Sequence, residues 1–389
     1  MKIAILGFGT VGRGVDQIIS ASVPGLEVTR ILELPDRLTD SRMTSDYDQI
    51  VSDPDVDAVV ECMGGIEPAH TFIAAALRAG KHVVTSNKAV VAEHFAEFAS
   101  LAGEAGVGLF IEATCGGGIP WIASVEKVRR VDEVSSFKGI LNGTTNYIID
   151  QMHKNGLDFD EVLAKAQELG YAERDPSADI DGIDVKNKTI ISASVAFDVA
   201  CTHDLPVSGI RNLTKADMEV LAGLGLSVKL LGRGVRSGDA YAVAVEPVAI
   251  PQSSLEANVP DNFNLVSVVG PSIGELKFYG QGAGSLPTGN AIVQDLIDCA
   301  AGVRPTYDFS QGLAYDPSLL VSDYLLRATA CAPDGATEMA PGMWRMADMT
   351  AEAARAELAR ALRDRPARVS RRASQGGLAH DQGRKVRRL

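Results

Sequence analysis

The chain has 389 residues, 46% of them hydrophobic and 22% charged, a composition typical of a folded globular protein with two or three domains. Its formal net charge of -13 argues against nucleic acid as the main partner. Five scattered cysteines without CxxC or His-rich spacing favour reduced thiols in a cytoplasm over a zinc site, and we expect neither a targeting signal nor a bilayer-spanning segment. The cysteines are Cys62, Cys115, Cys201, Cys299 and Cys331.

The chain begins with a predicted strand, a glycine-rich turn and a helix. An apolar run over residues 2–6 precedes Gly7-Phe-Gly-Thr-Val-Gly12, and apolar residues at helical spacing follow. This is G-x-G-x-x-G in the strand-to-helix context of dinucleotide-binding folds. Gly7 would make the tight turn, Gly9 would let a diphosphate approach, and Gly12 would let helix and strand pack closely. The alternative is a glycine-rich turn without a ligand. The expected cofactor contacts here are Gly7, Phe8, Gly9, Thr10, Val11 and Gly12.

The second predicted strand, residues 28–33, ends in an acid. Glu33 lies twenty-one residues after Gly12, close to the spacing at which a carboxylate binds the ribose 2′-hydroxyl of NAD. It therefore favours NAD. Arg37 could instead meet the 2′-phosphate of NADP, so both cofactors stay open.

The alternation of strands and helices continues through residue 111. Buried-strand patterns over 57–65, 81–88 and 107–111 are separated by helical patterns, which predicts a doubly wound parallel sheet. Ligands of such sheets bind at the carboxyl ends of the strands. Gly64, Ser86 and Lys88 fall there, so we expect them to contact cofactor, although Lys88 also has a plain interpretation as a surface lysine.

A glycine-rich turn, residues 112–120, follows this sheet. Cys115 has no nearby histidine to activate it, so a structural thiol is favoured over a nucleophile. The local carbonyl groups and the Glu112 carboxylate could instead form an oxygen site for a hard cation.

The most unusual stretch lies between Gly170 and Lys188. After a predicted strand (134–141), a polar loop (142–147) and a helix (159–169), it gathers five carboxylates in front of an apolar run. Asp184 and Lys188 are four residues apart, so a helix starting near Gly182 would place them on one face. A lysine at the edge of a buried helix is desolvated, which lowers its pKa and makes it a candidate acid or base. The alternative is a solvated acidic loop.

The rest of the chain is less informative. Residues 241–248 and 264–270 alternate like strands, and a Gly-rich turn ending at Gly284 precedes a helix that would close over the cofactor. Residues 311–365 hold little alternating strand sequence. The basic stretch 366–389 is expected to be a disordered, solvated end, and the alternative is an interaction tail.

Taken in order, these motifs resemble the homoserine dehydrogenase family over about residues 1–310. The shared motifs are the glycine-rich start, Ser86-Asn-Lys88-Ala, Glu112-Ala-Thr, Asn142-Gly-Thr-Thr-Asn146-Tyr, the stretch from Gly170 to Lys188, and Gly282-Ala-Gly284.

The resemblance implies specific roles. Lys188 would exchange a proton with the substrate oxygen, assisted by Asp184, and Glu173 would bind the substrate ammonium. Lys88 would contact cofactor and substrate, and Asp179 would also belong to the substrate site. The family's alkali metal, usually sodium, would be held by Glu112 and the carbonyl groups of Cys115, Gly117 and Ile119. Two lysines in one pocket should also lower each other's pKa.

The resemblance also implies the activity and architecture. The reaction would interconvert L-homoserine and L-aspartate 4-semialdehyde with NAD or NADP, in threonine, methionine and isoleucine biosynthesis, in a cytoplasmic homodimer. The alternatives are another NAD(P)-dependent oxidoreductase on a small polar substrate, or a non-catalytic dinucleotide sensor.

The expected fold is α/β, with a Rossmann-type doubly wound sheet and a second α+β domain for catalysis and dimerisation. The expected domains are 1–130, to which 285–310 returns, and 131–284. A C-terminal extension, 311–365, resembles a degenerate ACT domain, and the basic tail follows it.

Overall fold

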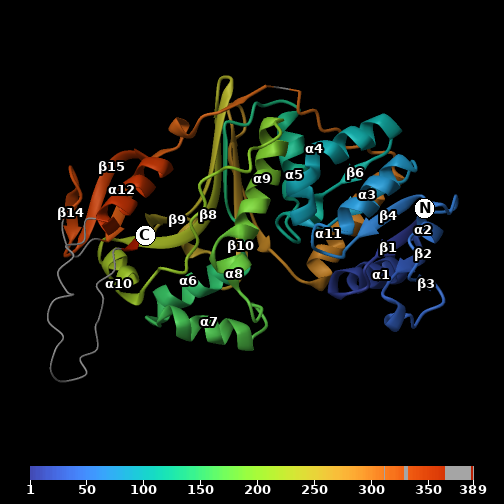
Figure 1. Ribbon diagram of the computed structural model, residues 1–389, viewed down its shortest axis with the longest axis horizontal. Coiled ribbons are helices and arrows are strands. Elements are labelled where there is room, and N and C mark those ends of the chain that lie inside the picture. The colour runs from blue at the N-terminus through green and yellow to red at the C-terminus, as the bar shows by residue number, and fades with distance from the viewer. Residues whose placement is uncertain (311, 328–331, 364–386, 389) are drawn as a thin grey trace.

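The computed structural model describes residues 1–310, 312–327, 332–363 and 387–388. The protein is elongated: an N-terminal parallel sheet, a large central antiparallel sheet and a smaller C-terminal sheet follow one another along its long axis (Figure 1). The expected disordered tail, 366–389, lies outside the described residues except for Arg387–Arg388.

The N-terminal sheet has six parallel strands in the order β3-β2-β1-β4-β5-β6. Alternate side chains of β1 enter different cores, with Ile3 and Ile5 on one face and Ala4 and Leu6 on the other. Because helices cover both faces, the prediction of a doubly wound sheet is confirmed. The elements are β1 (Lys2–Leu6), α1 (Thr10–Ser22), β2 (Glu27–Leu32), β3 (Met43–Thr44), α2 (Asp48–Val51), β4 (Ala58–Glu61), α3 (Ala69–Arg78), β5 (His82–Thr85), α4 (Lys88–Ala105) and β6 (Leu109–Phe110).

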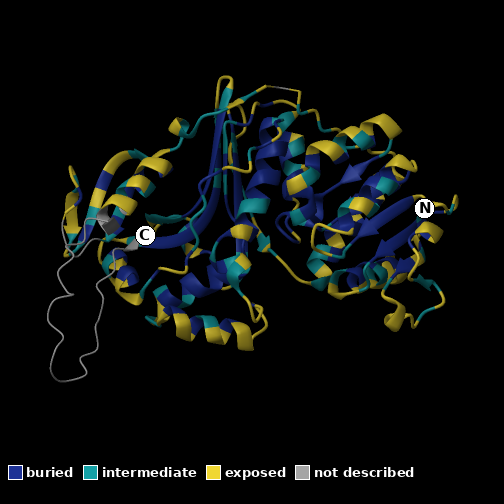
Figure 2. Cartoon of the chain, in the orientation of Figure 1, coloured by how far each residue is buried: buried dark blue, intermediate teal, exposed yellow. Residues whose placement is uncertain are grey.

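A helix from late in the chain completes this domain. α11 (Ser285–Ala300) packs against α1, and its side chains Ile292 and Leu296 join the core formed by Ile3, Ile5 and Val15. Figure 2 shows the strands of this domain buried beneath partly exposed helices. The later segment therefore lies beside the glycine-rich turn.

The central sheet has the order β11-β10-β7-β8-β9-β12 and is antiparallel except where β12 joins β9. Helix α9 packs against β8, β9, α4 and α5, so it lies between the first two sheets. The close approach needs Gly232, because a Cβ there would lie 2.1 Å from Thr189 Oγ1. The elements are α5 (Trp121–Arg129), β7 (Ser136–Ile140), α6 (Gly143–Asn155), α7 (Phe159–Glu168), α8 (Ser177–Ile180), α9 (Ile183–Phe197), α10 (Lys215–Gly223), β8 (Leu226–Ser237), β9 (Ala240–Pro251), β10 (Phe263–Gly270), β11 (Gly274–Gln281) and β12 (Ala314–Tyr315).

One local expectation was wrong. The predicted polar loop 142–147 is the start of α6, and the Asn142 side chain caps it by accepting a hydrogen bond from the Thr145 backbone N–H at 2.8 Å. Asparagine is a preferred helix N-cap, so the polar residues mark a helix start.

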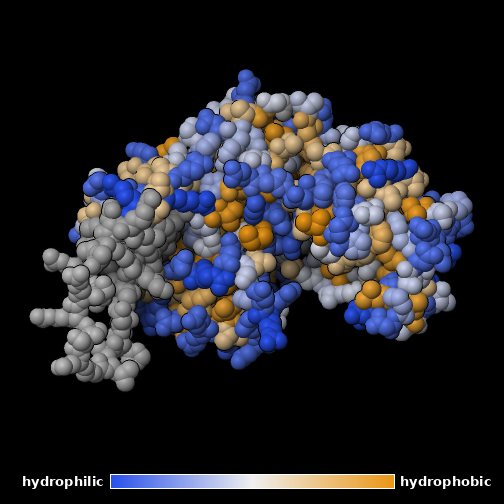
Figure 3. Space-filling view, viewed as in Figure 1, coloured by the Kyte–Doolittle hydropathy of each residue, from blue (hydrophilic) through white to orange (hydrophobic). Residues whose placement is uncertain are grey.

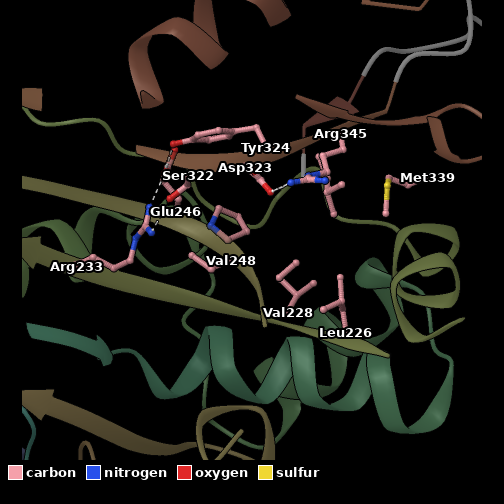
Figure 4. Close-up of a pocket in the computed structure, with 13 residues that line it drawn as sticks. Leu226, Val228, Arg233, Glu246, Val248, Ser322, Asp323, Tyr324, Met339 and Arg345 are labelled. Carbon is pink, nitrogen blue, oxygen red and sulfur yellow. Dashed lines mark hydrogen bonds and ion pairs between the residues drawn. The ribbon is translucent and has the colours of Figure 1, made fainter. Parts of the chain in front are cut away.

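The C-terminal extension contains more strand than its sequence suggested. In the extension, β13 (Val321–Arg327), β14 (Thr337–Ala340) and β15 (Met343–Thr350) form a sheet, accompanied by α12 (Ala351–Arg363). Two residues of the tail, which was expected to be disordered, add a short strand, β16 (Arg387–Arg388), so the order is β14-β15-β13-β16. A cavity of about 350 Å³ lies between this sheet and the strands β8 and β9 (Figure 4). The Tyr324 hydroxyl donates across the boundary to Glu246 at 2.8 Å, and Arg233 pairs with the same carboxylate at 3.1 Å.

No described helix combines the length and apolar character that a bilayer crossing requires. On the face shown in Figure 3, hydrophilic and hydrophobic side chains alternate in small patches over the described elements.

Candidate functional site

The glycine-rich turn between β1 and α1 has the geometry that a bound diphosphate requires. Gly7 has a φ of 88°, and a Cβ on Gly12 would lie 2.2 Å from the Gly7 carbonyl oxygen. A Cβ on Gly9 would meet no atom within 4 Å. Gly7 therefore turns the chain, Gly12 lets the turn pack closely, and Gly9 leaves open space at the start of α1, where Thr10 and Val11 follow.

Glu33 lies at the end of β2 beside this turn. Its carboxylate accepts hydrogen bonds from the backbone N–H groups of Phe8 at 3.0 Å and Leu34 at 2.8 Å. It also lines a cavity of about 420 Å³ together with Phe8, Gly9, Arg13 and Arg37. Two carboxylates, Glu33 and Asp36, and the two guanidinium groups thus line the space where the adenosine end of a dinucleotide would lie.

A buried network that we did not foresee from the sequence holds the ends of β4 and β5. Glu61, fully buried, accepts hydrogen bonds from the Thr85 hydroxyl at 2.6 Å and the Met63 backbone N–H at 2.7 Å. The Asn87 amide donates to the Gly65 carbonyl oxygen at 2.7 Å. The turn carrying Gly64 is therefore tied to the segment carrying Ser86 and to the start of α4. The available signal was an acid inside an otherwise apolar strand, which needs a buried partner.

The centre of the site is a carboxylate between two lysines. Asp184, in the first turn of α9, is 2.8 Å from the Lys88 ammonium through Oδ1 and 2.9 Å from the Lys188 ammonium through Oδ2. Lys188 also donates to the Leu141 carbonyl oxygen at 2.7 Å, and its side chain is 10% exposed. The structure thus brings together Lys88 from α4 with Asp184 and Lys188 from α9.

Asn142 extends this cluster. Its amide nitrogen donates to Asp184 at 2.9 Å and to Asp179 at 2.7 Å, while its oxygen caps α6. Burial is the main reason that the pKa of Asp179 is raised. Burial also acts to raise the pKa of Asp184, but Lys188, Lys88 and Asn142 together hold it below its usual range. Asp184 is therefore ionised at any physiological pH.

The expectation that the two lysines lower each other's pKa was wrong for Lys88. The charge of Asp184 is the largest influence on Lys88 and raises its pKa, whereas partial burial acts in the opposite direction. A shared carboxylate outweighs the repulsion between the ammonium groups.

Glu173 is not part of this cluster. It is exposed in the turn between α7 and α8, where its backbone carbonyl accepts a hydrogen bond from Gln167 at 2.9 Å. Within the described part of the chain its carboxylate has no ion pair. It would meet the other groups only through a ligand.

The second glycine-rich turn serves several purposes. The Glu112 carboxylate accepts hydrogen bonds from the backbone N–H groups of Ile122 at 3.0 Å and Ala123 at 2.7 Å, so it caps α5. Burial raises its pKa to about 7. The Ile119 carbonyl accepts from the Trp121 N–H at 2.7 Å. No described N–H donates to the carbonyl oxygens of Cys115 or Gly117, so these two remain available to a cation.

The expected structural role of Cys115 agrees with its surroundings. The thiol is fully buried, burial raises its pKa to about 12, and its sulfur lies 3.6 Å from the Lys188 carbonyl oxygen. Gly117 packs against Gly282, since a Cβ on Gly117 would lie 2.4 Å from that residue's carbonyl carbon. Gly284 is the N-cap residue that precedes α11, and the Ser285 hydroxyl donates to the Thr10 carbonyl oxygen at 2.7 Å. The turn thus contacts α9, which carries Lys188, and the segment that leads into α11.

This arrangement suits proton transfer beside a dinucleotide. A lysine ammonium has three N–H donors, and Lys188 directs two of them to Leu141 and Asp184. The third meets no acceptor among the described residues, so it can serve a ligand oxygen. A substrate bound between α4 and α9 would reach this proton.

Comparison with known proteins agrees with the geometry. The sequence model of the homoserine dehydrogenase family matches residues 120–297. The sequence model of the homoserine dehydrogenase NAD-binding domain matches residues 7–112. The homoserine dehydrogenase of Synechocystis is 40% identical over 346 residues, which are 82% of this chain and 77% of that protein. That of Bacillus subtilis is 36% identical over 323 residues, or 78% of this chain and 74% of that protein.

Solved structures show the same similarity. A homoserine dehydrogenase from Thiobacillus denitrificans superposes with a TM-score of 0.85 at 30% identity, covering 100% of this chain and 97% of that one. A hyperthermophilic archaeal homoserine dehydrogenase mutant in complex with NADPH has a TM-score of 0.68 at 25% identity, covering 78% and 98%.

Proposed function

This chain belongs to the homoserine dehydrogenase family of NAD(P)-dependent oxidoreductases, and we propose that Lys188, held by Asp184, exchanges the proton in its reaction. The observation that carries this proposal is the third N–H of Lys188, which is left for a ligand after Leu141 and Asp184 have taken two. The substrate pair is L-homoserine and L-aspartate 4-semialdehyde.

The chain's own residues divide the work. A nicotinamide cofactor, when bound at the glycine-rich turn, would supply or accept the hydride. As the aldehyde is reduced, Lys188 donates a proton to the developing alkoxide, and in the oxidation direction it accepts the hydroxyl proton. Asp184 orients Lys188 and balances its charge, while Lys88, paired with the same carboxylate, would contact both substrate and cofactor. Glu173 binds the substrate ammonium from the exposed turn. Asp179 also belongs to the substrate site, since the Asn142 amide links its carboxylate to that of Asp184.

We propose NAD as the preferred cofactor, because Glu33 places a negative charge in the 420 Å³ cavity beside the glycine-rich turn. A carboxylate there accepts a ribose hydroxyl and repels a 2′-phosphate. The opposing feature is Arg37, which lines the same cavity. The remaining cofactor contacts we propose are Gly7, Phe8, Gly9, Thr10, Val11, Gly12, Gly64, Ser86, Lys88 and Gly284.

Glu33→Gln should lower the ratio of kcat/KM with NAD to that with NADP, in homoserine oxidation, by about tenfold, since about 1.4 kcal/mol of discrimination corresponds to that factor. Glutamine keeps an acceptor for the Phe8 N–H, so the turn is preserved. The matched control is Asp36→Asn, which removes another charge from the same cavity. An unchanged ratio in Glu33→Gln, or wild-type enzyme that favours NADP, would overturn the preference.

We also propose an alkali-metal site, with sodium as its ion, at the second glycine-rich turn. The available carbonyl oxygens of Cys115 and Gly117 support it, and oxygen ligands suit hard cations. Ile119 and Glu112 complete the proposed set. Because the Glu112 carboxylate already caps α5, its contribution is to fix the turn as much as to bind the ion.

Exchanging sodium chloride for choline chloride at equal ionic strength should lower both the melting temperature and kcat. The physical reason is that an ion bound only to the folded state stabilises it by mass action. Differential scanning fluorimetry and steady-state assays measure the two effects. Equal melting temperatures and equal kcat values in the two salts would contradict the proposed sodium site.

Domains, assembly and location complete the proposal. The proposed dinucleotide-binding domain comprises residues 1–130 together with 285–310, and the proposed catalytic and dimerisation domain comprises residues 131–284. An ACT-like extension covers residues 311–365. A homodimer is supported by Leu255 and Tyr279, 64% and 54% exposed, whose segments are joined by the ion pair of Lys277 with Glu256. Free thiols at the four described cysteines agree with a cytoplasmic location.

A further inference from the structure

Two histidines and a glutamate meet on the outside of the N-terminal domain. His70 lies in the first turn of α3, and His94 and Glu97 lie one turn apart on α4. Glu97 Oε2 is 2.8 Å from His70 Nε2 and 3.6 Å from His94 Nδ1. In the described part of the chain, this is the one group of three possible metal ligands whose donor atoms all lie within 4.8 Å of one another.

His70 carries the support that metal-binding histidines usually have. Its other nitrogen, Nδ1, is 3.0 Å from Glu67 Oε1, and the Thr71 hydroxyl donates to Glu67 Oε2 at 2.9 Å. A carboxylate on one ring nitrogen fixes the tautomer and directs the lone pair of the other nitrogen toward an ion. Glu67 therefore presents Nε2 of His70 to Glu97 and His94.

The distances suit a tetrahedral ion. Ligand atoms about 2.0–2.2 Å from zinc lie about 3.3 Å apart in a tetrahedron, and the distances from Glu97 Oε2 to His70 Nε2 (2.8 Å) and to His94 Nδ1 (3.6 Å) fall on either side of that value. We propose that His70 Nε2, His94 Nδ1 and the Glu97 carboxylate form a binding site for a divalent transition-metal ion of the zinc type. The three side chains are 23%, 27% and 40% exposed, so water completes the coordination.

Binding requires a small rearrangement of the two rings. They are stacked with centroids 4.0 Å apart and planes 28° apart, so each must turn about its side chain to aim its nitrogen at a shared point. The backbone of α4 already departs from helical geometry at His94, with φ −123° and ψ 18°. Partial exposure of both rings leaves room for that movement.

The competing arrangement is a protonated His70 held between two carboxylates. The hydrogen bond to Glu97 is the main influence that raises the pKa of His70, and Glu67 adds to it. A proton and a metal ion compete for the same nitrogen. Only a bound metal ion uses His94 as a ligand. Replacing His94 should therefore abolish metal binding, whereas it should not prevent protonation of His70 between Glu67 and Glu97.

An ion here would join two neighbouring helices of the N-terminal domain. Its ligands join the first turn of α3 to α4, which begins at Lys88 beside the Asn87 cap. Crosslinking two helices through a metal restrains their relative movement. The site is thus separate from the proposed sodium turn and does not depend on the assignment of Lys188.

The test uses the full chain, freed of metal with a chelator, and Zn²⁺ as the probe. Competition against a chromogenic chelator should show one equivalent of Zn²⁺ that is lost in both His70→Gln and His94→Gln. Co²⁺ in its place should give visible d–d bands of tetrahedral intensity. Glu67→Gln should keep the stoichiometry but weaken binding by about 10–100-fold, as expected for a group that orients a ligand.

His203→Gln is the matched control, because His203 also faces a carboxylate, that of Glu93 at 3.4 Å, but belongs to no described group of three ligands. It should leave the stoichiometry unchanged. Circular dichroism checks that each variant is folded, and Glu97→Gln replaces any histidine variant that is not. Binding that survives His94→Gln, or no binding by the wild-type chain, would overturn the proposal.

Discussion

Lys188→Met lowers kcat for homoserine oxidation by about 10²–10⁴-fold, the range expected when a positioned acid or base is removed. Methionine keeps the length and apolar stem of the side chain within the buried helix α9. Asp184 keeps its hydrogen bond from Asn142 and its ion pair with Lys88, so the pocket is not left with an isolated charge. Steady-state assays at saturating substrate measure the loss.

Cofactor binding separates a chemical from a structural effect. Lys188→Met should bind NAD(P)H with an affinity within a fewfold of wild type, measured by fluorescence titration. Lys186→Met is the control, since this lysine lies in the same turn of α9 and is outside the Asp184 cluster. If Lys188→Met retains near wild-type kcat, Lys188 does not exchange the proton.

Asp184→Asn removes both turnover and part of the stability. The change leaves the Lys188 ammonium, whose side chain is 10% exposed, without its counter-charge. Removing one partner of a buried ion pair costs about 3 kcal/mol of unfolding free energy, at the lower end of the usual range because Lys88, at 43% exposure, can reach solvent. Urea unfolding measures this value. The pKa of Lys88 should fall as well, because Asp184 is the main cause of its rise.

A second substitution distinguishes the two losses. Asp184→Asn combined with Lys188→Met removes the unpaired charge, so it should regain much of the stability but none of the activity. The control is Asp181→Asn, which breaks an exposed pair with Arg211 and should change the unfolding free energy by less than about 1 kcal/mol. If the double variant is no more stable than Asp184→Asn, the unpaired ammonium is not the cause.

Local patterns allowed the most reliable predictions. The turn from Gly7 to Gly12 and the Asp184–Lys188 spacing each lie within one or two turns of chain, so the sequence contains all the geometry that they need. The fold class followed from the alternation of strand and helix patterns, and the family from the six motifs taken in order; both are confirmed. The start of α9 after Gly182 is also as expected.

Contacts between distant segments were the harder part. The sequence around Lys88 does not show that Asp184 lies 2.8 Å away and raises the pKa of Lys88. Likewise, the sequence around Glu112 does not show that its carboxylate accepts hydrogen bonds from the first turn of α5. The polar residues after Asn142 were interpreted as a loop because a helix cap and a loop use the same residue types. His70 and His94 meet only because α3 and α4 pack together.

The carboxylate of Asp184 has a mechanical consequence as well. Its two ion pairs reach Lys88, at the start of α4 in the N-terminal domain, and Lys188, on the same helix α9 as Asp184 itself. A movement of the N-terminal domain away from α9 would stretch the pair with Lys88 but keep the pair with Lys188, because Asp184 and Lys188 lie on the same helix.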